Sequence, residues 1–262
     1  MKSERRAWLY DLLLIAVLLI GAYFRTVGLD WDAGQHLHPD ERFLTMVESA
    51  LQVKKCALPN TALEACPPDQ VRWLSFGDYL DTRTSPLNPV NRGYGFFVYG
   101  DFPIVLVRYV GEWLGQVGYD QIHLVGRQLS GLSDLLTILV LYILAARLYD
   151  RRVALLGAAF SALAVEQIQQ SHFFIVDNFA NLFIFLALLC AVEILLRPPR
   201  RGGETQAPEP PTRPGRLRRF LPDPFLLLSL GFGLSLGLAV ASKLNAAPLA
   251  VVLPGAFLLR FL

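Results

Sequence analysis

Apolar residues occupy this chain in long blocks rather than at alternating or helically spaced positions. A soluble helix keeps a polar face at helical spacing, and these blocks have none. About 20 apolar residues are enough for a helix to cross a bilayer. We therefore predict an all-α fold, a polytopic bundle of transmembrane helices. The six candidate spans are Trp8–Phe24, Leu129–Ala146, Val153–Val165, Phe173–Leu196, Phe225–Ala241 and Ala246–Leu262.

Two of these blocks need comment. The first follows the basic residues Lys2, Arg5 and Arg6, as the apolar part of a signal peptide does, but no small-residue cleavage site comes after it. We interpret it as an uncleaved transmembrane helix. The third block is short and ends in a polar run, Glu166–Gln170, so it either stops partway through the membrane or buries those groups among its neighbours.

A long polar stretch, residues 25–127, separates the first two blocks and is rich in Pro, Gly, Asn and Asp clusters. It predicts a large extramembrane loop. Within it, Phe102–Val117 mixes apolar residues with Arg108 and Glu112, which favours a helix lying in the membrane interface, with a crossing as the alternative. The expected divisions of the chain are residues 1–24, 25–127, 128–196, a disordered Pro-rich and Arg-rich linker at 197–224, and 225–262.

Basic residues in short loops predict the orientation, because they tend to stay in the cytoplasm. Such residues occur before the first block, at Arg147, Arg151 and Arg152, and throughout residues 197–224. These three groups agree if every block crosses once. The loop at 25–127 is then extracytoplasmic.

Composition supports the membrane assignment, since 53% of the 262 residues are hydrophobic and only 18% are charged. The formal net charge is +2, and the basic residues form no stripe interleaved with aromatic residues. Nucleic acid is therefore set aside as a partner.

Cys56 and Cys66 lie close together in the polar loop. Outside the cytoplasm they would be able to form a disulfide, and two free thiols fit their spacing equally well. Cys190 lies inside an apolar block, where we expect a small packing residue.

Candidate chemistry gathers in two polar clusters. Residues 28–43 carry four carboxylates and two histidines directly after the first block, and residues 166–178 end in Asp177 at the start of an apolar helix. Without a functional role, residues 28–43 would be a solvated loop, and Asp177 would be an acid favoured by the dipole at a helix N-terminus. Ionisable groups at membrane depth are nevertheless candidates for function, and both clusters open to the same side. Lys243 is a lone cation that either snorkels to the headgroups or contacts a phosphate.

The order of these motifs resembles the C-type glycosyltransferases of family 39, polyprenyl-phosphate-dependent enzymes similar to protein O-mannosyltransferases and aminoarabinose transferases. The motifs are His38–Phe43, Arg127 opening the next span, Tyr149–Arg152, His172–Asp177 and Ser242–Asn245. Their order and their placement against the spans carry the resemblance, which covers almost the entire chain.

The resemblance implies an inverting transfer of a sugar to an acceptor hydroxyl, with Asp40 as the general base. Glu41 would orient the acceptor or the base. Asp177 matches a second acidic position that shapes the site or holds a cation near the donor phosphate. Lys243 and Arg127 match basic positions near that phosphate.

Histidines were considered as metal ligands because imidazole is a common one. His36, His38 and His172 are able to bind a divalent cation, although structural or hydrogen-bonding roles are commoner for such residues. His172 is also a candidate for shaping the donor site. No metal or other cofactor is assigned at this point.

The resemblance further implies a polyprenyl-phosphate-linked sugar as donor, a protein, lipid or glycan as acceptor, and a bacterial cell membrane as the location. It predicts that this sequence is the N-terminal portion of a longer enzyme. The competing interpretation is a transporter or lipid flippase, whose membrane-depth charges line a substrate route. That interpretation predicts inverted repeats, which we do not find in the sequence. A purely structural subunit would leave the acidic cluster without a purpose.

Overall fold

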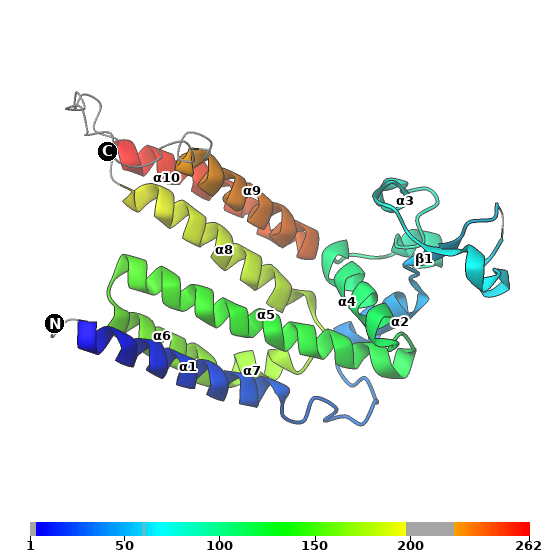
Figure 1. The fold of residues 1–262 in the computed structure, drawn as a ribbon, viewed down its shortest axis with the longest axis horizontal. Helices are drawn as coiled ribbons and strands as arrows, with labels where there is room; N and C mark the ends of the chain where they lie inside the picture. Colours follow the sequence, from blue (N-terminus) through cyan, green and yellow to red (C-terminus); the bar gives the residue numbers. More distant parts are fainter. Residues whose placement is uncertain (1–3, 60, 198–222) are drawn as a thin grey trace, which may run out of the picture.

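The structure is a computed structural model, and it describes residues 4–59, 61–197 and 223–262. The predicted linker at 197–224 lies almost wholly outside the described residues. Successive helices of the bundle run back and forth, and the segment between the first and second long helices lies at one end of the bundle (Figure 1). Helix α1 begins and helix α10 ends at the opposite end of the bundle (Figure 1).

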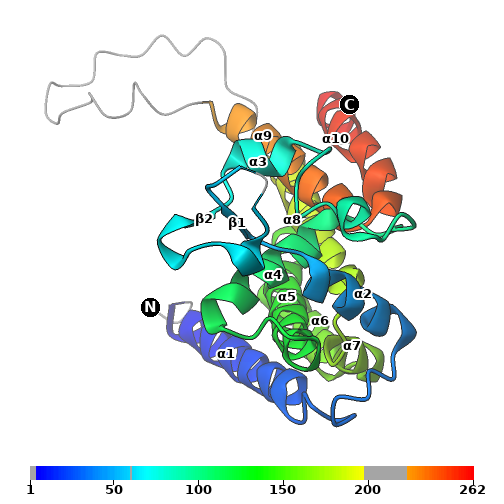
Figure 2. The same cartoon turned by 90° about the vertical axis from the view of Figure 1, so that its right-hand side faces the viewer.

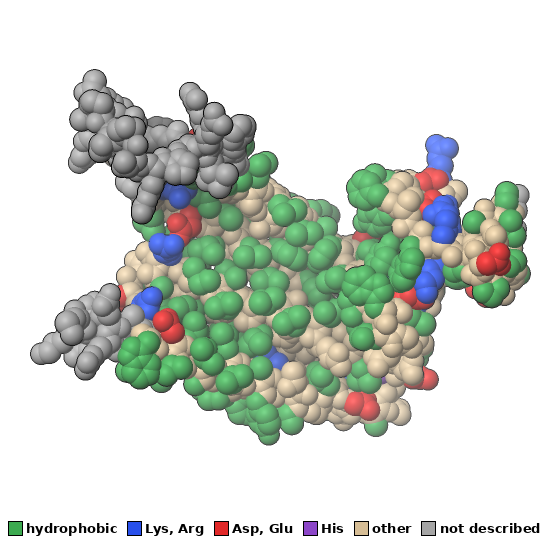
Figure 3. Space-filling view, viewed as in Figure 1, with side chains coloured by type: hydrophobic (Ala, Val, Ile, Leu, Met, Phe, Trp, Pro, Cys, Tyr) green, Lys and Arg blue, Asp and Glu red, His purple; other side chains and the backbone are tan. Residues whose placement is uncertain are grey.

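Four described helices are long and apolar enough to cross a membrane. They are α1 (Glu4–Thr26), α5 (Tyr119–Leu148), α8 (Val176–Leu196) and α9 (Pro224–Ser242). Large apolar side chains on their outer faces are exposed, such as Leu19 on α1 and Leu234 on α9. Hydrophobic side chains cover the visible face of the bundle, while most charged ones lie near its ends or on the loop segment (Figure 3). This distribution is the one that a lipid solvent requires, and it confirms the expected class of helical membrane protein.

The other two predicted spans form shorter helices. Helix α6 (Arg151–Leu163) has 13 residues, or about 20 Å of rise, against a hydrocarbon core of about 30 Å. Extended backbone at Ala164 ends it, and α7 (Val165–Ser171) carries the chain onward. The last block begins as a 3₁₀ helix, η5 (Leu244–Val251), which contains Pro248, and continues as α10 (Val252–Phe261). Six uninterrupted spans are thus not what the described chain forms.

Helix α5 is longer than predicted. Its 30 residues rise about 45 Å, which exceeds the hydrocarbon core by several turns. It begins at Tyr119, inside the stretch that we expected to be a loop, so its length leaves the first turns to project beyond the hydrocarbon core of a bilayer that the rest crosses. His123 and Arg127 lie on this projecting part.

The loop segment has its own secondary structure. Helix α2 (Pro39–Ala50) opens it, strands β1 (Lys54–Cys56) and β2 (Val71–Trp73) pair antiparallel, and α3 (Phe76–Leu80) and α4 (Asp101–Leu114) follow. Short 3₁₀ helices occupy Leu63–Ala65, Pro68–Gln70 and Pro89–Arg92. Cys56 and Cys66 form a disulfide, which decides between the two alternatives for these cysteines. Cys190 is free and packs against an apolar cluster of α8, α9 and α10.

An apolar core joins this segment to the bundle. Leu44 of α2, Ile104 of α4, Ile122 of α5 and Phe179 of α8 are buried in one cluster. Seen from that end of the molecule, α4 lies across the end of α5 (Figure 2). The predicted helix around Arg108 and Glu112 is confirmed, and the two side chains form an ion pair at 3.3 Å. Its buried face packs against protein, so the loop segment and the ends of α5 and α8 form one unit.

Candidate functional site

A cavity of about 520 Å³ lies where α2, α5, α7 and α8 meet, and we call it the acidic cavity. Four of its lining side chains are carboxylates: Asp40, Asp134, Glu166 and Asp177. The others are His38, Gln167, Gln170, Ile175, Asn178 and Asn181. The two acidic motifs that the sequence singled out, far apart along the chain, thus line the same space.

Asp40 stands at the second position of α2. His38 is the N-cap of this helix, its ring accepting a hydrogen bond from the Glu41 N–H, and Pro39 takes the first position, where its missing N–H costs nothing. A carboxylate in the first turn is stabilised by the helix dipole. The Asp40 side chain is exposed and faces the acidic cavity.

Tyr99 is a neighbour of Asp40 that the sequence analysis missed. Burial, a hydrogen bond to Asp40 and the charges of Asp40 and Asp177 together raise the pKa of Tyr99 to about 12. The loop carrying Tyr99 is held against the end of α9, because the Gly100 N–H donates to the Ser242 carbonyl at 3.1 Å. Residue 100 has to be glycine, since a Cβ there would collide with the backbone of Ala241. Nothing in the local pattern around Tyr99 distinguishes it from an ordinary interfacial aromatic residue.

Asp177 lies in the first turn of α8 and forms an ion pair with Lys243 at 2.5 Å. Both side chains keep substantial exposure, 46% for Asp177 and 36% for Lys243. Lys243 follows the last residue of α9. Its ammonium group lies at the edge of the acidic cavity, because it binds Asp177, which lines that cavity. An exposed pair of this kind exchanges partners easily, because solvent screens it.

Asp134 closes the inner side of the cavity, and the sequence analysis missed it as well. Arg25, only 1% exposed, donates to the Asp134 carboxylate at 2.5 Å and also to the backbone carbonyls of Gly21, Ser161 and Ala162. An ionisable residue inside an otherwise apolar block was the signal that would have found Asp134. The pair joins α1, α5 and α6 directly beneath the cavity.

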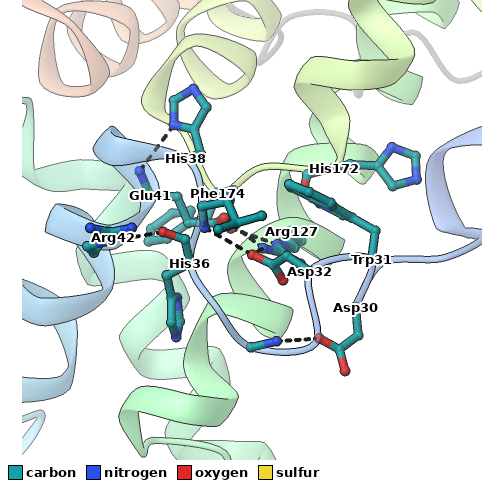
Figure 4. Close-up of polar contacts among 12 residues, drawn as sticks. Asp30, Trp31, Asp32, His36, His38, Glu41, Arg42, Arg127, His172 and Phe174 are labelled. Carbon is teal, nitrogen blue, oxygen red and sulfur yellow. Dashed lines mark hydrogen bonds and ion pairs between the residues drawn. The ribbon is translucent and has the colours of Figure 1, made fainter.

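Arg127, Glu41 and Asp32 form a second group, which we call the buried ion-pair cluster. Arg127 donates to both Glu41 carboxylate oxygens at 2.7 Å and to Asp32 at 2.9 Å, and its side chain is 0% exposed (Figure 4). The Phe174 N–H donates to Glu41 at 2.9 Å (Figure 4). Burial raises the pKa of Asp32, but hydrogen bonds from Arg127 and from the Leu37 N–H outweigh that effect and the pKa falls below its usual value.

Arg127 was expected at the donor phosphate and Glu41 at the acceptor. In the structure both side chains are 0% exposed and bound to each other, Arg127 also to Asp32. Neither lines the acidic cavity. They instead join α2, α5 and the connection before α8, which fixes the direction in which Asp40 points.

His172, expected to shape the donor site, lies between two backbone carbonyls. Its Nδ1 lies 2.8 Å from the Ile168 carbonyl and its Nε2 lies 2.8 Å from the Val27 carbonyl. With both ring nitrogens engaged, the imidazole ties α7 to the end of α1 and has no atom left for a phosphate or a metal. His172 borders a smaller apolar pocket with Trp31 and Phe173. Of the three histidines considered as ligands, His38 alone lines the acidic cavity.

The chemistry available in the acidic cavity follows from its lining. An exposed carboxylate such as Asp40 is able to accept a proton from a hydroxyl group, and Lys243 is able to neutralise a phosphate at the edge. Carboxylate and amide oxygens of Asp177 and Asn178 are ligands of the kind that hard divalent cations take.

Comparisons with family models, with curated proteins and with solved structures found no match to this chain.

Proposed function

We propose that this protein is a membrane glycosyltransferase that moves a sugar from a polyprenyl-phosphate donor to an acceptor hydroxyl. The observation that supports this proposal most directly is the shared cavity: Asp40 and Asp177 line one space at the end of the bundle. A transferase of this kind needs a base for the acceptor and a charged environment for a departing phosphate, at a place that a lipid headgroup can reach.

Asp40 is the general base in this proposal. It takes the proton of the acceptor hydroxyl as the oxygen attacks the anomeric carbon, and the bond between that carbon and the phosphate oxygen breaks on the opposite face. One carboxylate is enough for such an inverting displacement, since no covalent intermediate forms. Tyr99 positions Asp40 through its hydrogen bond, and with a pKa of about 12 the phenol stays a donor at neutral pH.

Lys243 binds the donor phosphate in this proposal. It rests on Asp177 at 2.5 Å and is partly exposed, so an entering phosphate competes with that carboxylate for the ammonium group. A compact ammonium neutralises a phosphate without demanding a fixed geometry. Asp177 then holds Lys243 in place between turnovers.

The cavity faces the extracytoplasmic side in this proposal. The basic residues where α5 ends and α6 begins, Arg147 among them, lie at the opposite end of the bundle from the loop segment, as the positive-inside rule favours. The disulfide between Cys56 and Cys66 agrees, since such bonds persist in oxidising compartments. We infer that α6 with α7, and η5 with α10, supply the two remaining passes that place both chain ends in the cytoplasm.

The test measures sugar transfer by the full-length protein in detergent micelles, supplied with a panel of polyprenyl-phosphate sugars. Release of the lipid phosphate is the readout. We expect Asp40→Asn to lower the rate by about 10² to 10⁴-fold, the range for losing a general base. Asp69→Asn is the matched control, because Asp69 is an exposed aspartate of the same loop segment outside the cavity.

Membrane insertion and apparent melting temperature are measured in parallel, so that a folding defect is recognised. Transfer at an unchanged rate by Asp40→Asn would remove Asp40 from the reaction. If no donor in the panel releases phosphate but a lipid crosses the membrane in proteoliposomes, the flippase interpretation replaces this one.

A further inference from the structure

A separate group of ligand atoms lies beside the acidic cavity, where the loop of residues 27–38 folds against the first turns of α5. One ligand atom each from Asp30, Asp32 and His123 lies within 4.8 Å of those of the other two. Asp30 and Asp32 come from the same loop (Figure 4), whereas His123 comes from the projecting part of α5. None of the three lines the acidic cavity.

Two members of this group are buried, whereas Asp30 is exposed. His123 is 1% exposed and Asp32 is 6% exposed. Neither ring nitrogen of His123 has a hydrogen-bond partner of normal geometry among the described residues, and only a weak contact with the Tyr119 backbone supports the ring. The Oδ1 atom of Asp32 also has no partner there, because Arg127 and Leu37 both bind Oδ2. Leaving a buried polar atom unpaired costs about 1–3 kcal/mol, so several in one place call for an explanation.

A fourth side chain shares this condition. His36 is 2% exposed, both of its ring nitrogens are without a partner in the described chain, and its ring centre lies 4.4 Å from that of His123. Tyr119 covers the other side of the His36 ring at 4.3 Å. Two buried imidazoles that contact each other, with ring nitrogens that lack a hydrogen bond of normal geometry in the described part of the chain, are poorly explained as hydrogen-bonding residues.

The local charge favours a cation. Asp32 and Glu41 bind the Arg127 guanidinium and Asp30 lies close to Asp32, so two formal negative charges remain among these four groups. Glu41 holds Arg127 through both oxygens, which leaves Asp32 able to share its second oxygen with another cation. A divalent ion would balance this group.

We propose that Asp30, Asp32 and His123 bind a Zn²⁺ ion, next to the buried ring of His36. Imidazole nitrogen and carboxylate oxygens form a ligand set that zinc accepts, and three protein ligands leave its fourth position for water. The carboxylate of Asp32 bridges Zn²⁺ and Arg127, which orients it as outer partners orient metal ligands elsewhere. The ion fastens the loop to α5 and stabilises the buried ion-pair cluster, because Asp32 belongs to both groups. It lies outside the acidic cavity, so this inference does not depend on the proposed reaction.

Zinc binding is measured on the full-length protein in detergent after treatment with a chelator, by competition with a chromophoric chelator. We expect one Zn²⁺ per chain, and at least a tenfold weaker affinity in Asp30→Asn and in His123→Gln. Asp30→Asn is the cleaner variant, because the asparagine oxygen still accepts the Gly34 N–H that Asp30 accepts at 3.1 Å. Asp120→Asn, an exposed acid three residues before His123, is the control with unchanged affinity.

Two further measurements separate the alternatives. Cobalt substituted for zinc should give visible absorption bands of a nitrogen-containing ligand field, which weaken in His123→Gln even if that variant is less stable. Asp40→Asn should keep full zinc affinity. The proposal is overturned if the parent protein binds no zinc, if Asp30→Asn and His123→Gln bind it as the parent does, or if Asp40→Asn is the variant that loses it.

Discussion

The acidic cavity and the buried ion-pair cluster use the same kinds of side chain in opposite ways. Asp40 and Glu41 are adjacent in sequence and open the same helix, yet Asp40 is exposed to the cavity while Glu41 is 0% exposed and bound to Arg127. A carboxylate that is saturated by a guanidinium contributes rigidity. One that is left in contact with solvent keeps its capacity to accept a proton. The comparison teaches that position relative to the cavity, more than residue type, assigns the roles.

The largest effect on stability should come from breaking the buried cluster. Glu41→Ala leaves Arg127 charged, buried and without its bidentate partner, and removing one member of a buried pair costs about 3–5 kcal/mol. Chemical unfolding in detergent micelles measures this change. Asp40→Ala, one residue earlier, should shift stability by less than about 1 kcal/mol, and equal losses in the two variants would contradict the comparison.

The stability of the protein should also depend on pH through Glu48, on the same helix α2. It is 0% exposed, its carboxylate oxygens have no partner among the described residues, and burial raises its pKa well above the usual value despite the charge of Arg108. Because the folded pKa is the higher one, stability falls as the pH rises above the unfolded pKa. Glu48→Gln should therefore match the parent near pH 4 and gain stability over it towards pH 8. Melting curves across this range measure the difference, and parallel curves would show that Glu48 is ionised in the folded protein.

The next largest loss of stability is expected at Gly126, because this residue sets how closely α5 approaches Phe174. A Cβ at this position would collide with the Phe174 side chain, whose backbone N–H donates to Glu41. Overpacking a core costs typically about 1–3 kcal/mol, so we expect Gly126→Ala to lose stability in that range. Gly157→Ala is the control, since no atom lies near its added Cβ. Similar melting temperatures for the two variants would argue against this tight contact.

The smallest effect on stability is expected at the edge of the acidic cavity. Lys243→Met removes a partly exposed ion pair with Asp177, and such pairs contribute about 0–1 kcal/mol. The same variant should raise the KM for the polyprenyl-phosphate donor if Lys243 binds the phosphate. A large loss of stability with unchanged transfer kinetics would assign Lys243 to the structure instead.

Parts of this molecule could be predicted because a local pattern determines them. Long apolar blocks are enough to predict α1, α8 and α9, since a lipid solvent leaves little choice for such segments. Asp40 and Asp177 were found because each lies beside an apolar helix within a polar run. Their convergence on one cavity agrees with the topology that the basic residues predicted.

Other parts depend on contacts that no local pattern shows. The burial of Arg127 could not be predicted, because its partners, Glu41 and Asp32, come from a segment far away in sequence. Asp134 stands out locally as an acid inside an apolar block, but its pairing with Arg25 joins two helices and no local pattern shows it. The early end of α6 at Ala164 is decided by the polar residues after it, which face the cavity instead of continuing through lipid.

Because α5 is one unbroken helix, the membrane part and the part beyond it share a rotational phase. Each residue turns the helix by about 100°, so inserting a single alanine between Leu129 and Ser130 would swing Arg127 and His123 away from their partners while leaving the lipid-facing half in place. A four-residue insertion, close to one full turn, would restore the direction but raise both side chains by about 6 Å. The orientation of the lipid-facing half of α5 in the bilayer therefore determines the directions in which Arg127 and His123 point.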